Sequence, residues 1–250
     1  MEYTDRAEVE RIGRAGALWY ESDGAVIARV LSAFWLYCEP EDKAFTPWMK
    51  SDGFWEAWIT KWMSNRFPEN DHFIDVGANV GYYSMAAAKS GLHVTAYEPN
   101  PVVADLLERA AKHNRVEINL QRLALSNRAG KKKLAVPEGH SGGGHLAKEG
   151  IAVQASTLDK TNAMVGQNIL MKIDAEGAEP LIWAGSKETR EHNRVTTILE
   201  WDSSRFDADK FATELFDNHS VRLVNYDGNE EEISKDTLVN GDGIHMIVVR

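Results

Sequence analysis

Cysteine and long apolar runs are scarce in this sequence of 250 residues. Cys38 is the one cysteine, which excludes an intramolecular disulfide and a thiolate-rich metal site and favours a reducing compartment. The longest apolar stretch, from Val26 to Cys38, contains Arg29 and is too short to cross a bilayer. The polar N-terminus MEYTDRAEVE does not have the pattern of a secretory signal. We therefore expect a cytoplasmic protein without a membrane partner.

Basic residues are also scarce relative to acidic ones. The chain has 28 Lys and Arg against 38 Asp and Glu, a formal net charge of −10. Such a protein gains no general attraction to nucleic acids or anionic membranes. Lys131, Lys132 and Lys133 form a short basic cluster, which we interpret as a solvated turn. The charge balance disfavours a nucleic-acid partner and leaves a local basic groove as the alternative.

Short apolar segments alternate with helical patterns over most of the chain. The predicted core strands lie in the segments HFIDVGAN, LHVTAYEPN, INLQRLALS, NILMKIDAEGAEP and VTTILEWD. Helices are expected at 81–90, 101–113, 178–193 and 205–217. This alternation is typical of a parallel, doubly wound α/β sheet. The closing segments VRLVNY and HMIVVR, with no helix predicted between them, indicate an antiparallel hairpin at one edge.

The part of the chain before residue 67 has a different pattern. We expect an amphipathic helix over 5–19, one or two strands over 25–38 and a helix over 53–66. Residues 1–66 are therefore predicted to form an N-terminal helical and β cap that covers the substrate. Residues 67–250 are predicted to form the cofactor-binding domain.

A glycine-containing turn follows the first core strand. It reads Asp75-Val-Gly77-Ala-Asn79-Val-Gly81, and Gly77 and Gly81 allow the backbone to adopt positive φ and to approach a ligand closely. Glu98 ends the next strand, where a carboxylate can accept hydrogen bonds from both hydroxyls of a ribose. Together these residues predict an adenosine-containing cofactor.

Two details favour S-adenosylmethionine, with S-adenosylhomocysteine as product, over a nicotinamide cofactor. The turn reads GANVG, which departs from the G-x-G-x-x-G pattern that seats a diphosphate on a helix N-terminus. Asp75 would also repel a diphosphate and attract an ammonium group. A nicotinamide-dependent oxidoreductase is the alternative. Asn100 is a further candidate cofactor contact, or it caps the helix that begins at Pro101.

Several motifs together resemble the FkbM family of S-adenosylmethionine-dependent methyltransferases. They are DVGANVGYYS, AYEPNP, LALSN, STLDK and LMKIDAEGAEPLIWAG, in this order. The resemblance covers roughly residues 45–202. Gly53 to Glu56 (GFWE) is also similar to a short G-x-x-E element of the family, whereas Lys160 stands where the family often has an acid.

This resemblance implies a class I methyltransferase (Rossmann-like) fold over 67–250. We expect a mostly parallel sheet of seven strands with one antiparallel edge strand. It also implies contacts of Asp75, Gly77, Asn79 and Gly81 with the methionine part of the cofactor, and of Glu98 with its ribose. Leu125 and Ser126 would lie near the adenine, with strand packing and turn formation as the alternative.

Candidate catalytic residues follow the strand NILMKI. Asp174 is the leading candidate for a base, or for a group that orients the substrate hydroxyl. Glu176 and Glu179 belong to the same pocket or bond the amides that begin the next helix. Lys172 lies on the same strand face as Asp174 and is expected to pair with an acid.

The segment 138–145 contains four glycines and two histidines. A closing loop that carries His145 as a base is one interpretation, and a solvated hairpin tip is the other. Glu200 and Asp202 end the last core strand and either line the pocket or join Asp174 at a metal. No spacing demands a metal, so none is predicted.

Known members of the FkbM family methylate hydroxyl groups of polyketides, sugars and related natural products. We therefore predict an O-methyltransferase whose acceptor is a hydroxyl on a small molecule or saccharide. An RNA ribose 2′-O-methyltransferase, using Lys172, Asp174 and Glu200, is an alternative. A non-catalytic subunit that binds S-adenosylmethionine is another. The sequence predicts no oligomeric state.

Overall fold

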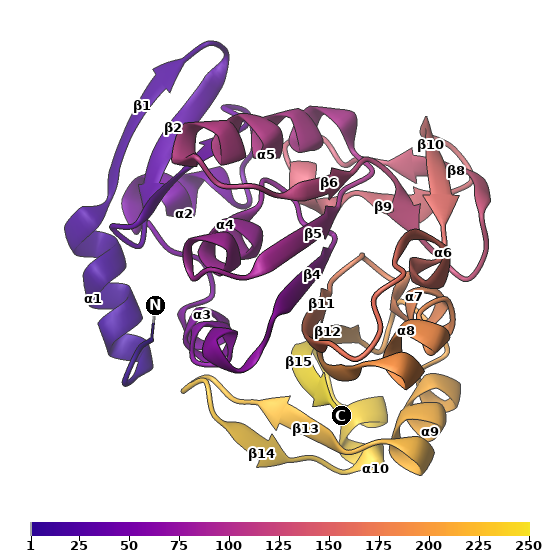
Figure 1. Cartoon of the computed structure of the whole chain (residues 1–250). Coiled ribbons are helices and arrows are strands. Elements are labelled where there is room, and N and C mark those ends of the chain that lie inside the picture. Colours follow the sequence, from indigo (N-terminus) through magenta and orange to yellow (C-terminus); the bar gives the residue numbers. More distant parts are fainter. Residues whose placement is uncertain (1) are drawn as a thin grey trace.

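The computed structural model describes residues 2–250, which contain a central eight-stranded sheet (Figure 1). Its order is β14-β13-β15-β12-β11-β4-β5-β6. Five strands run parallel to one another: β4 (His72–Val76), β5 (His93–Tyr97), β6 (Asn119–Gln121), β11 (Asn168–Ile173) and β12 (Arg194–Asp202). The chain proceeds from β4 towards β6 on one side and from β11 towards β12 on the other. The order therefore reverses between β4 and β11, which is where doubly wound sheets bind ligands.

The C-terminal side of the sheet differs from the prediction of seven strands with an antiparallel edge strand. β15 (Ile244–Val249) is antiparallel to β12, but it lies inside the sheet, between β12 and β13 (Val221–Val224). A further strand, β14 (Glu230–Glu232), forms the edge. It was missed because three consecutive glutamates do not show the apolar pattern of a strand. The two predicted closing strands, β13 and β15, do pair antiparallel. They are not joined as a simple hairpin, because β14 and helix α10 (Lys235–Asn240) lie between them in the chain.

Helices cover both faces of the sheet (Figure 1). α4 (Tyr82–Lys89) and α5 (Pro101–Asn114) belong to one apolar core, together with residues of the N-terminal segment. α7 (Glu179–Ala184) and α9 (Ala208–Asn218) belong to a second core on the other face, where α8 (Lys187–His192) also lies. No helix within residues 2–250 combines the length and apolar character that crossing a membrane requires.

The N-terminal segment forms a small antiparallel sheet. β1 (Leu18–Ser22), β2 (Ala25–Val30) and β3 (Phe34–Cys38) follow α1 (Arg6–Gly16) and precede α2 (Thr46–Ser51) and α3 (Ala57–Ser64). The predicted helix over 5–19 is therefore too long. It ends at Gly16, where a Cβ would overlap the side chain of Ser32, and Leu18 and Trp19 pair with β2 instead. The predicted helix over 53–66 likewise begins only at Ala57.

A third sheet lies beside the carboxyl edge of the main one. It has the order β7-β10-β8-β9, with bounds β7 (Ala124–Leu125), β8 (Gly130–Ala135), β9 (His145–Ala147) and β10 (Ile151–Ser156). The segment INLQRLALS, predicted as one strand, is split between β6 of the main sheet and β7 of this one. Short helices α6 (Leu158–Thr161), η1 (Phe67–Glu69) and η2 (Ser141–Gly143) complete the chain.

The N-terminal sheet is joined to the main body by a buried amide. Asn114, at the end of α5, accepts a hydrogen bond from the backbone N–H of Trp35 (2.9 Å) and donates to the carbonyl of Trp35 (2.6 Å). Leu36 of β3 and Leu107 of α5 belong to the same core. Residues before 67 therefore share their core with the rest of the chain.

We predict that Asn114→Ala lowers the free energy of unfolding by about 1–3 kcal/mol, because two buried backbone groups lose their partner. The transition should remain single, since both parts share one core. Urea unfolding followed by circular dichroism measures both quantities. Lys112→Ala, an exposed position on the same helix, is the control and should change stability by less than about 0.5 kcal/mol. Two separate transitions in the wild type would contradict the shared core.

Candidate active site

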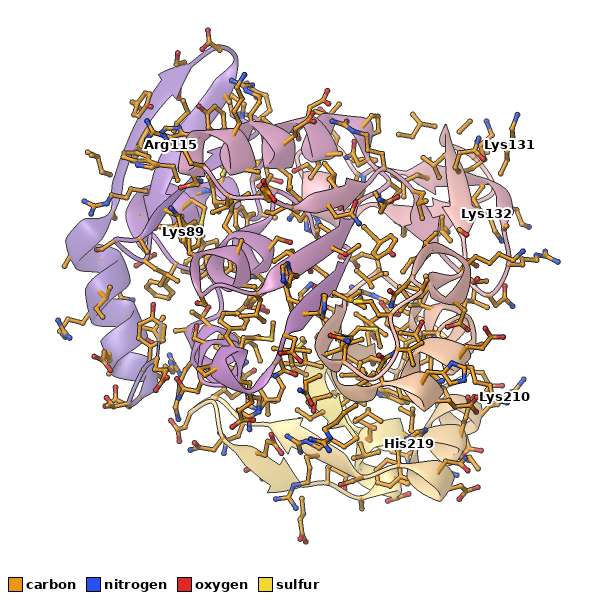
Figure 2. The ribbon with its side chains drawn as sticks, viewed as in Figure 1. Lys89, Arg115, Lys131, Lys132, Lys210 and His219 are labelled. Carbon is orange, nitrogen blue, oxygen red and sulfur yellow. The ribbon has the colours of Figure 1, made fainter. Side chains whose placement is uncertain are left out.

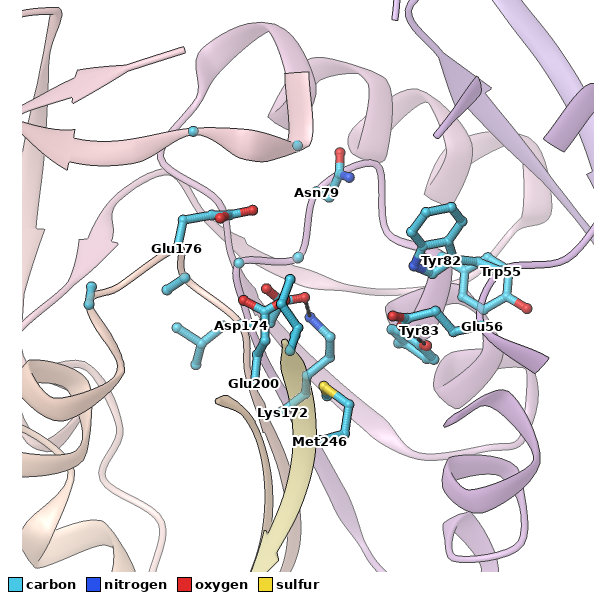
Figure 3. A pocket seen from close by; sticks show the side chains of 18 of the residues that line it. Trp55, Glu56, Asn79, Tyr82, Tyr83, Lys172, Asp174, Glu176, Glu200 and Met246 are labelled. Atoms are coloured by element: carbon cyan, nitrogen blue, oxygen red, sulfur yellow. Dashed lines mark hydrogen bonds and ion pairs between the residues drawn. The ribbon is translucent and has the colours of Figure 1, made fainter. Parts of the chain in front are cut away.

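A cavity of about 850 Å³ lies at the carboxyl ends of β4 and β11 (Figure 3). Its wall includes residues from the turns after β4, β5 and β11, from the loop 140–146, and from the N-terminal segment. It therefore occupies the position at which the order of the sheet reverses, as a doubly wound fold predicts.

The turn after β4 is held tightly against the turn after β11. Gly77 has φ +75°, and a Cβ at this position would overlap the carbonyl oxygen of Asp174, so only glycine fits. Asn79 has φ +51° and lines the cavity with Gly77. Gly81, the residue before α4, has φ +88° and lies against Leu107 of α5. It is not part of the cavity wall.

Glu98 faces the cavity from the end of β5. Its side chain accepts hydrogen bonds from the backbone N–H groups of Asn79 (2.9 Å) and Asn100 (2.8 Å). Each oxygen keeps a lone pair for a further donor. Burial raises the pKa of Glu98 to about 7. Asn100 caps α5 by accepting from the N–H of Val102 (3.1 Å) and does not line the cavity, so its capping interpretation fits its position.

Asp75 lies beneath the cavity and is not part of its wall. It is 1% exposed, and its Oδ2 accepts a hydrogen bond from Ser84 (2.6 Å). Its Oδ1 has no hydrogen-bond partner within residues 2–250 and lies 4.0 Å from Lys172 Nζ. Of the two predicted adenine contacts, Leu125 lines the cavity and the fully buried Ser126 does not.

Lys172 and Asp174 lie on the same face of β11, as strand alternation predicts. Lys172 Nζ donates to Asp174 Oδ2 at 2.9 Å, and both residues line the cavity. Burial favours the neutral amine of Lys172, but Asp174 and Asp75 outweigh it and raise the pKa of Lys172 above its usual value. The lysine is therefore a permanent cation at the base of the site.

Arg205 organises the other acids and was missed by the sequence analysis. Its guanidinium contacts Glu176 (2.7 Å), Glu200 (2.7 Å) and Asp202 (2.9 Å). Burial and the charges of Asp174 and Glu176 raise the pKa of Glu200 to about 9. Arg205 follows Asp202 by three residues, and an arginine so soon after a strand with two terminal acids was the available signal.

Glu179 points to the turn rather than to the cavity. It is 1% exposed and accepts from the backbone N–H of Ala175 (2.8 Å), in keeping with the amide-bonding alternative. Within residues 2–250, no set of three or more His, Cys, Asp or Glu side chains is arranged to hold a metal ion.

Glu56 is a second group that was not among the predicted catalytic residues. It lines the cavity from the N-terminal segment, at the residue before α3. Tyr83 OH donates to its Oε2 at 2.9 Å. Burial and the nearby charge of Asp174 raise the pKa of Glu56 to about 7. Its place in the GFWE motif was visible in the sequence. Because this motif is far along the chain from the other cavity residues, the sequence did not show that Glu56 reaches the cavity.

The loop 138–145 covers part of the cavity. A Cβ on Gly142 would lie 2.5 Å from Asn79 Nδ2, so the loop rests directly on the turn after β4. His140 and Ser141 line the cavity, whereas His145 is exposed on β9 and is not part of the wall. The structure thus brings Asp174 and Glu176 together in the cavity but leaves His145 outside it.

Asp42 fastens this loop to the N-terminal segment. Its Oδ2 accepts from both the N–H and the hydroxyl of Ser141 (3.0 Å each), while its Oδ1 accepts from the amides of Ala44, Phe45 and Thr46. Burial alone would raise the pKa of Asp42, but the hydrogen bonds from Thr46, Phe45 and Ser141 outweigh it and hold the pKa below its usual value.

The strand order, the glycine turn and the carboxylate at the end of β5 define a class I methyltransferase-like α/β fold with a mixed sheet. The chain belongs to the FkbM methyltransferase family, because the sequence model of the methyltransferase FkbM domain matches residues 75–227. The family and the coarse fold class predicted from the sequence are thus confirmed. No curated protein matches the chain.

Solved structures with a similar arrangement have little sequence in common with this chain. A methyltransferase FkbM from Methylobacillus flagellatus is 12% identical, with a TM-score of 0.48 over 73% of this chain and 44% of that one. The 16S rRNA N2 G1207 methyltransferase of Thermus thermophilus is 12% identical, with a TM-score of 0.49 over 93% of this chain and 50% of that one.

A tRNA (uracil-54, C5)-methyltransferase from Pyrococcus abyssi is 10% identical, with a TM-score of 0.50 over 92% of this chain and 44% of that one. The chain thus spans about half the length of each of these three proteins. At such low identity, this likeness concerns the fold alone.

We predict that Asp42→Asn loosens the loop 138–145. An amide cannot accept on both sides as the carboxylate does, and hydrogen bonds to a charged group contribute about 1.5–3 kcal/mol. Amide hydrogen exchange of a peptide spanning this loop should accelerate about tenfold or more. Asp23→Asn, at an exposed turn, is the control. Unchanged exchange in Asp42→Asn would show that the loop is held by other contacts.

Proposed function

We propose that this chain binds S-adenosylmethionine in the cavity and transfers its methyl group to a hydroxyl oxygen of a small molecule or saccharide. The observation that carries the proposal is Glu98, a buried carboxylate at the end of β5 that faces the cavity with lone pairs to spare. A carboxylate in this position suits the two hydroxyls of a ribose. The family to which the chain belongs supports methyl transfer as the reaction.

The residues around Glu98 fit the remainder of this cofactor. Gly77 and Asn79 present backbone close to the cavity, where the methionine part would lie. Leu125 offers an apolar surface for the adenine. Asp75 and Gly81 support this arrangement from behind the wall, and Asn100 holds Glu98 through its N–H.

The charge of the cavity wall favours a cationic ligand. Seven Asp and Glu side chains line it, against one lysine and one arginine. A bound cation would favour the ionised form of those acids whose pKa burial raises, Glu56, Glu98 and Glu200. When bound, S-adenosylmethionine supplies an electrophilic methyl group on a positively charged sulfonium. Carboxylates in a low-dielectric cavity attract such a charge more strongly than the uncharged sulfur of the product.

The acceptor would lie against the N-terminal segment and the β13–β14 turn. Phe45, Trp55 and Trp58 of the N-terminal segment line the cavity together with Tyr226 of the turn. The rings of Trp58 and Tyr226 pack edge to face, with their centroids 5.1 Å apart. Aromatic faces suit a sugar ring or another flat, neutral molecule. Residues 1–66 would thus act as the predicted substrate-covering cap.

Among the bases predicted from the sequence, Asp174 has the best position to orient an acceptor hydroxyl. Its carboxylate lies in the cavity beside Lys172 (Figure 3). Glu176 also faces the cavity, but Arg205 holds it. His145 would have to turn inward from β9 to take part.

An RNA acceptor is less compatible with the surface charges. Lys131 and Lys132 project outward from β8, and neither lines the cavity (Figure 2). The acids around the cavity would repel phosphates. Salt-dependent binding of a short RNA hairpin to the purified chain would favour the RNA alternative.

We predict that Glu98→Gln weakens S-adenosylmethionine binding by about 10- to 100-fold, since hydrogen bonds to a charged group contribute about 1.5–3 kcal/mol each. Titration calorimetry with S-adenosylmethionine, S-adenosylhomocysteine and NAD measures the effect. Glu117→Gln, an exposed carboxylate, is the control and should bind as the wild type does. Tighter binding of NAD than of the two adenosyl ligands would overturn the cofactor assignment.

The acceptor class is tested with a methyl-labelled cofactor. Phenols, neutral sugars, amino sugars and an RNA hairpin are incubated with the protein, and label is measured in each product. We expect transfer to a hydroxyl oxygen of a non-phosphorylated ring compound. Cofactor binding with transfer to none of these probes would favour the non-catalytic partner subunit.

A further inference from the structure

Glu56 is held in a backbone conformation that glutamate rarely adopts. Its φ is +38° and its ψ is 68°, in the left-handed region, at the residue immediately before α3. Its carbonyl accepts from the N–H of Thr60 (2.9 Å), and the hydroxyl of Thr60 lies 2.9 Å from Tyr82 OH. Non-glycine residues in this region persist where the surroundings fix them, often at functional sites.

The conformation places the Glu56 carboxyl on the cavity wall, across from Asp174. Figure 3 shows Glu56 beside Trp55 and Tyr83 on one side, and Asp174 with Lys172 on the other. The two carboxyls have different partners. Asp174 is paired with the Lys172 ammonium at 2.9 Å. Glu56 accepts from the Tyr83 phenol and has no ion pair within the described residues.

Glu56 therefore lacks the adjacent cation that Asp174 has. Burial and the charge of Asp174 raise the pKa of Glu56 to about 7, while Tyr83 and Lys172 act in the opposite direction. Tyr82 also faces Glu56 from α4. A base whose pKa is near neutrality is ionised in a large fraction of molecules and still binds a proton strongly enough to remove it from a hydroxyl. Where two carboxyls share a site, their different environments can assign the acid and base roles to different side chains.

We propose that Glu56 is the proton acceptor of the methyl transfer and that Tyr83 positions it. The proposal rests on the proposed O-methyltransferase function. The acceptor oxygen forms its bond to the methyl carbon as the carbon–sulfur bond breaks, and that electron pair stays on sulfur as the neutral thioether. The hydroxyl proton passes to Glu56, which later releases it to solvent. Asp174 stays paired with Lys172 and orients the acceptor.

The first test uses proton release on binding, which needs no acceptor. Titration calorimetry at pH 7 in buffers of different ionisation enthalpy gives the number of protons released with S-adenosylmethionine and with S-adenosylhomocysteine. Both ligands share the ribose that meets Glu98, whereas only the first carries the sulfonium charge. We expect the first to release up to about half a proton more, because the charge favours ionised Glu56 when its pKa is near the pH.

Glu56→Gln should abolish this excess while S-adenosylmethionine still binds. Glu179→Gln is the matched control, because burial also raises the pKa of Glu179 to about 7 but its side chain lies outside the cavity wall. It should keep the excess. Tyr83→Phe is a second variant, which removes the hydrogen-bond donor to Glu56. It also serves as the test if Glu56→Gln does not fold. Without the phenol donor, the pKa of Glu56 rises, so the excess should peak at higher pH.

Equal proton release with the two ligands in the wild type would overturn the role of Glu56, as would an excess that survives in Glu56→Gln. An unchanged pH dependence in Tyr83→Phe would overturn the positioning role of Tyr83. Absence of S-adenosylmethionine binding to the wild type would instead overturn the proposed function, and this inference with it. The two failures are thus distinguishable.

Discussion

Two acids at the carboxyl edge of the sheet, Asp75 and Asp174, share one buried cation, Lys172. It lies opposite Asp75 in the register between β4 and β11 and is 3% exposed. Its ammonium is bonded to Asp174 and lies 4.0 Å from Asp75. Buried charges require a partner, and without Lys172 the two carboxylates would lose the cation that they share. The lysine thus holds two acidic side chains together at the point where the sheet changes direction.

The N-terminal segment supplies the side of the cavity that the main sheet does not. Trp55 and Glu56 reach the wall from the turn before α3, and Phe45 reaches it from the start of α2. The same segment contributes to the core under α4 and α5. Its packing and its part in the site therefore depend on one another, because the residues that form the wall are fixed by the core beneath them.

The parts of the site that the sequence predicted follow from local rules. The glycine turn after β4 and Glu98 after β5 are encoded by strand ends, and strand alternation placed Lys172 beside Asp174. Glu56 was missed because packing between distant segments brings it to the cavity wall. Arg205 follows Asp202 by three residues, so local spacing could have indicated it. The edge strand β14 was missed because backbone pairing with β13 forms it, while its side chains carry no strand pattern.

The hydrogen bonds of Asp42 connect two separate parts of the cavity wall. One carboxylate holds both the start of α2, which brings Phe45 to the cavity wall, and Ser141 in the loop above Asn79. The two walls are therefore tied to a single anchor. We therefore expect a displacement of the loop over Asn79 to disturb the hydrogen bonds of Asp42 and, through them, the cavity wall at Phe45.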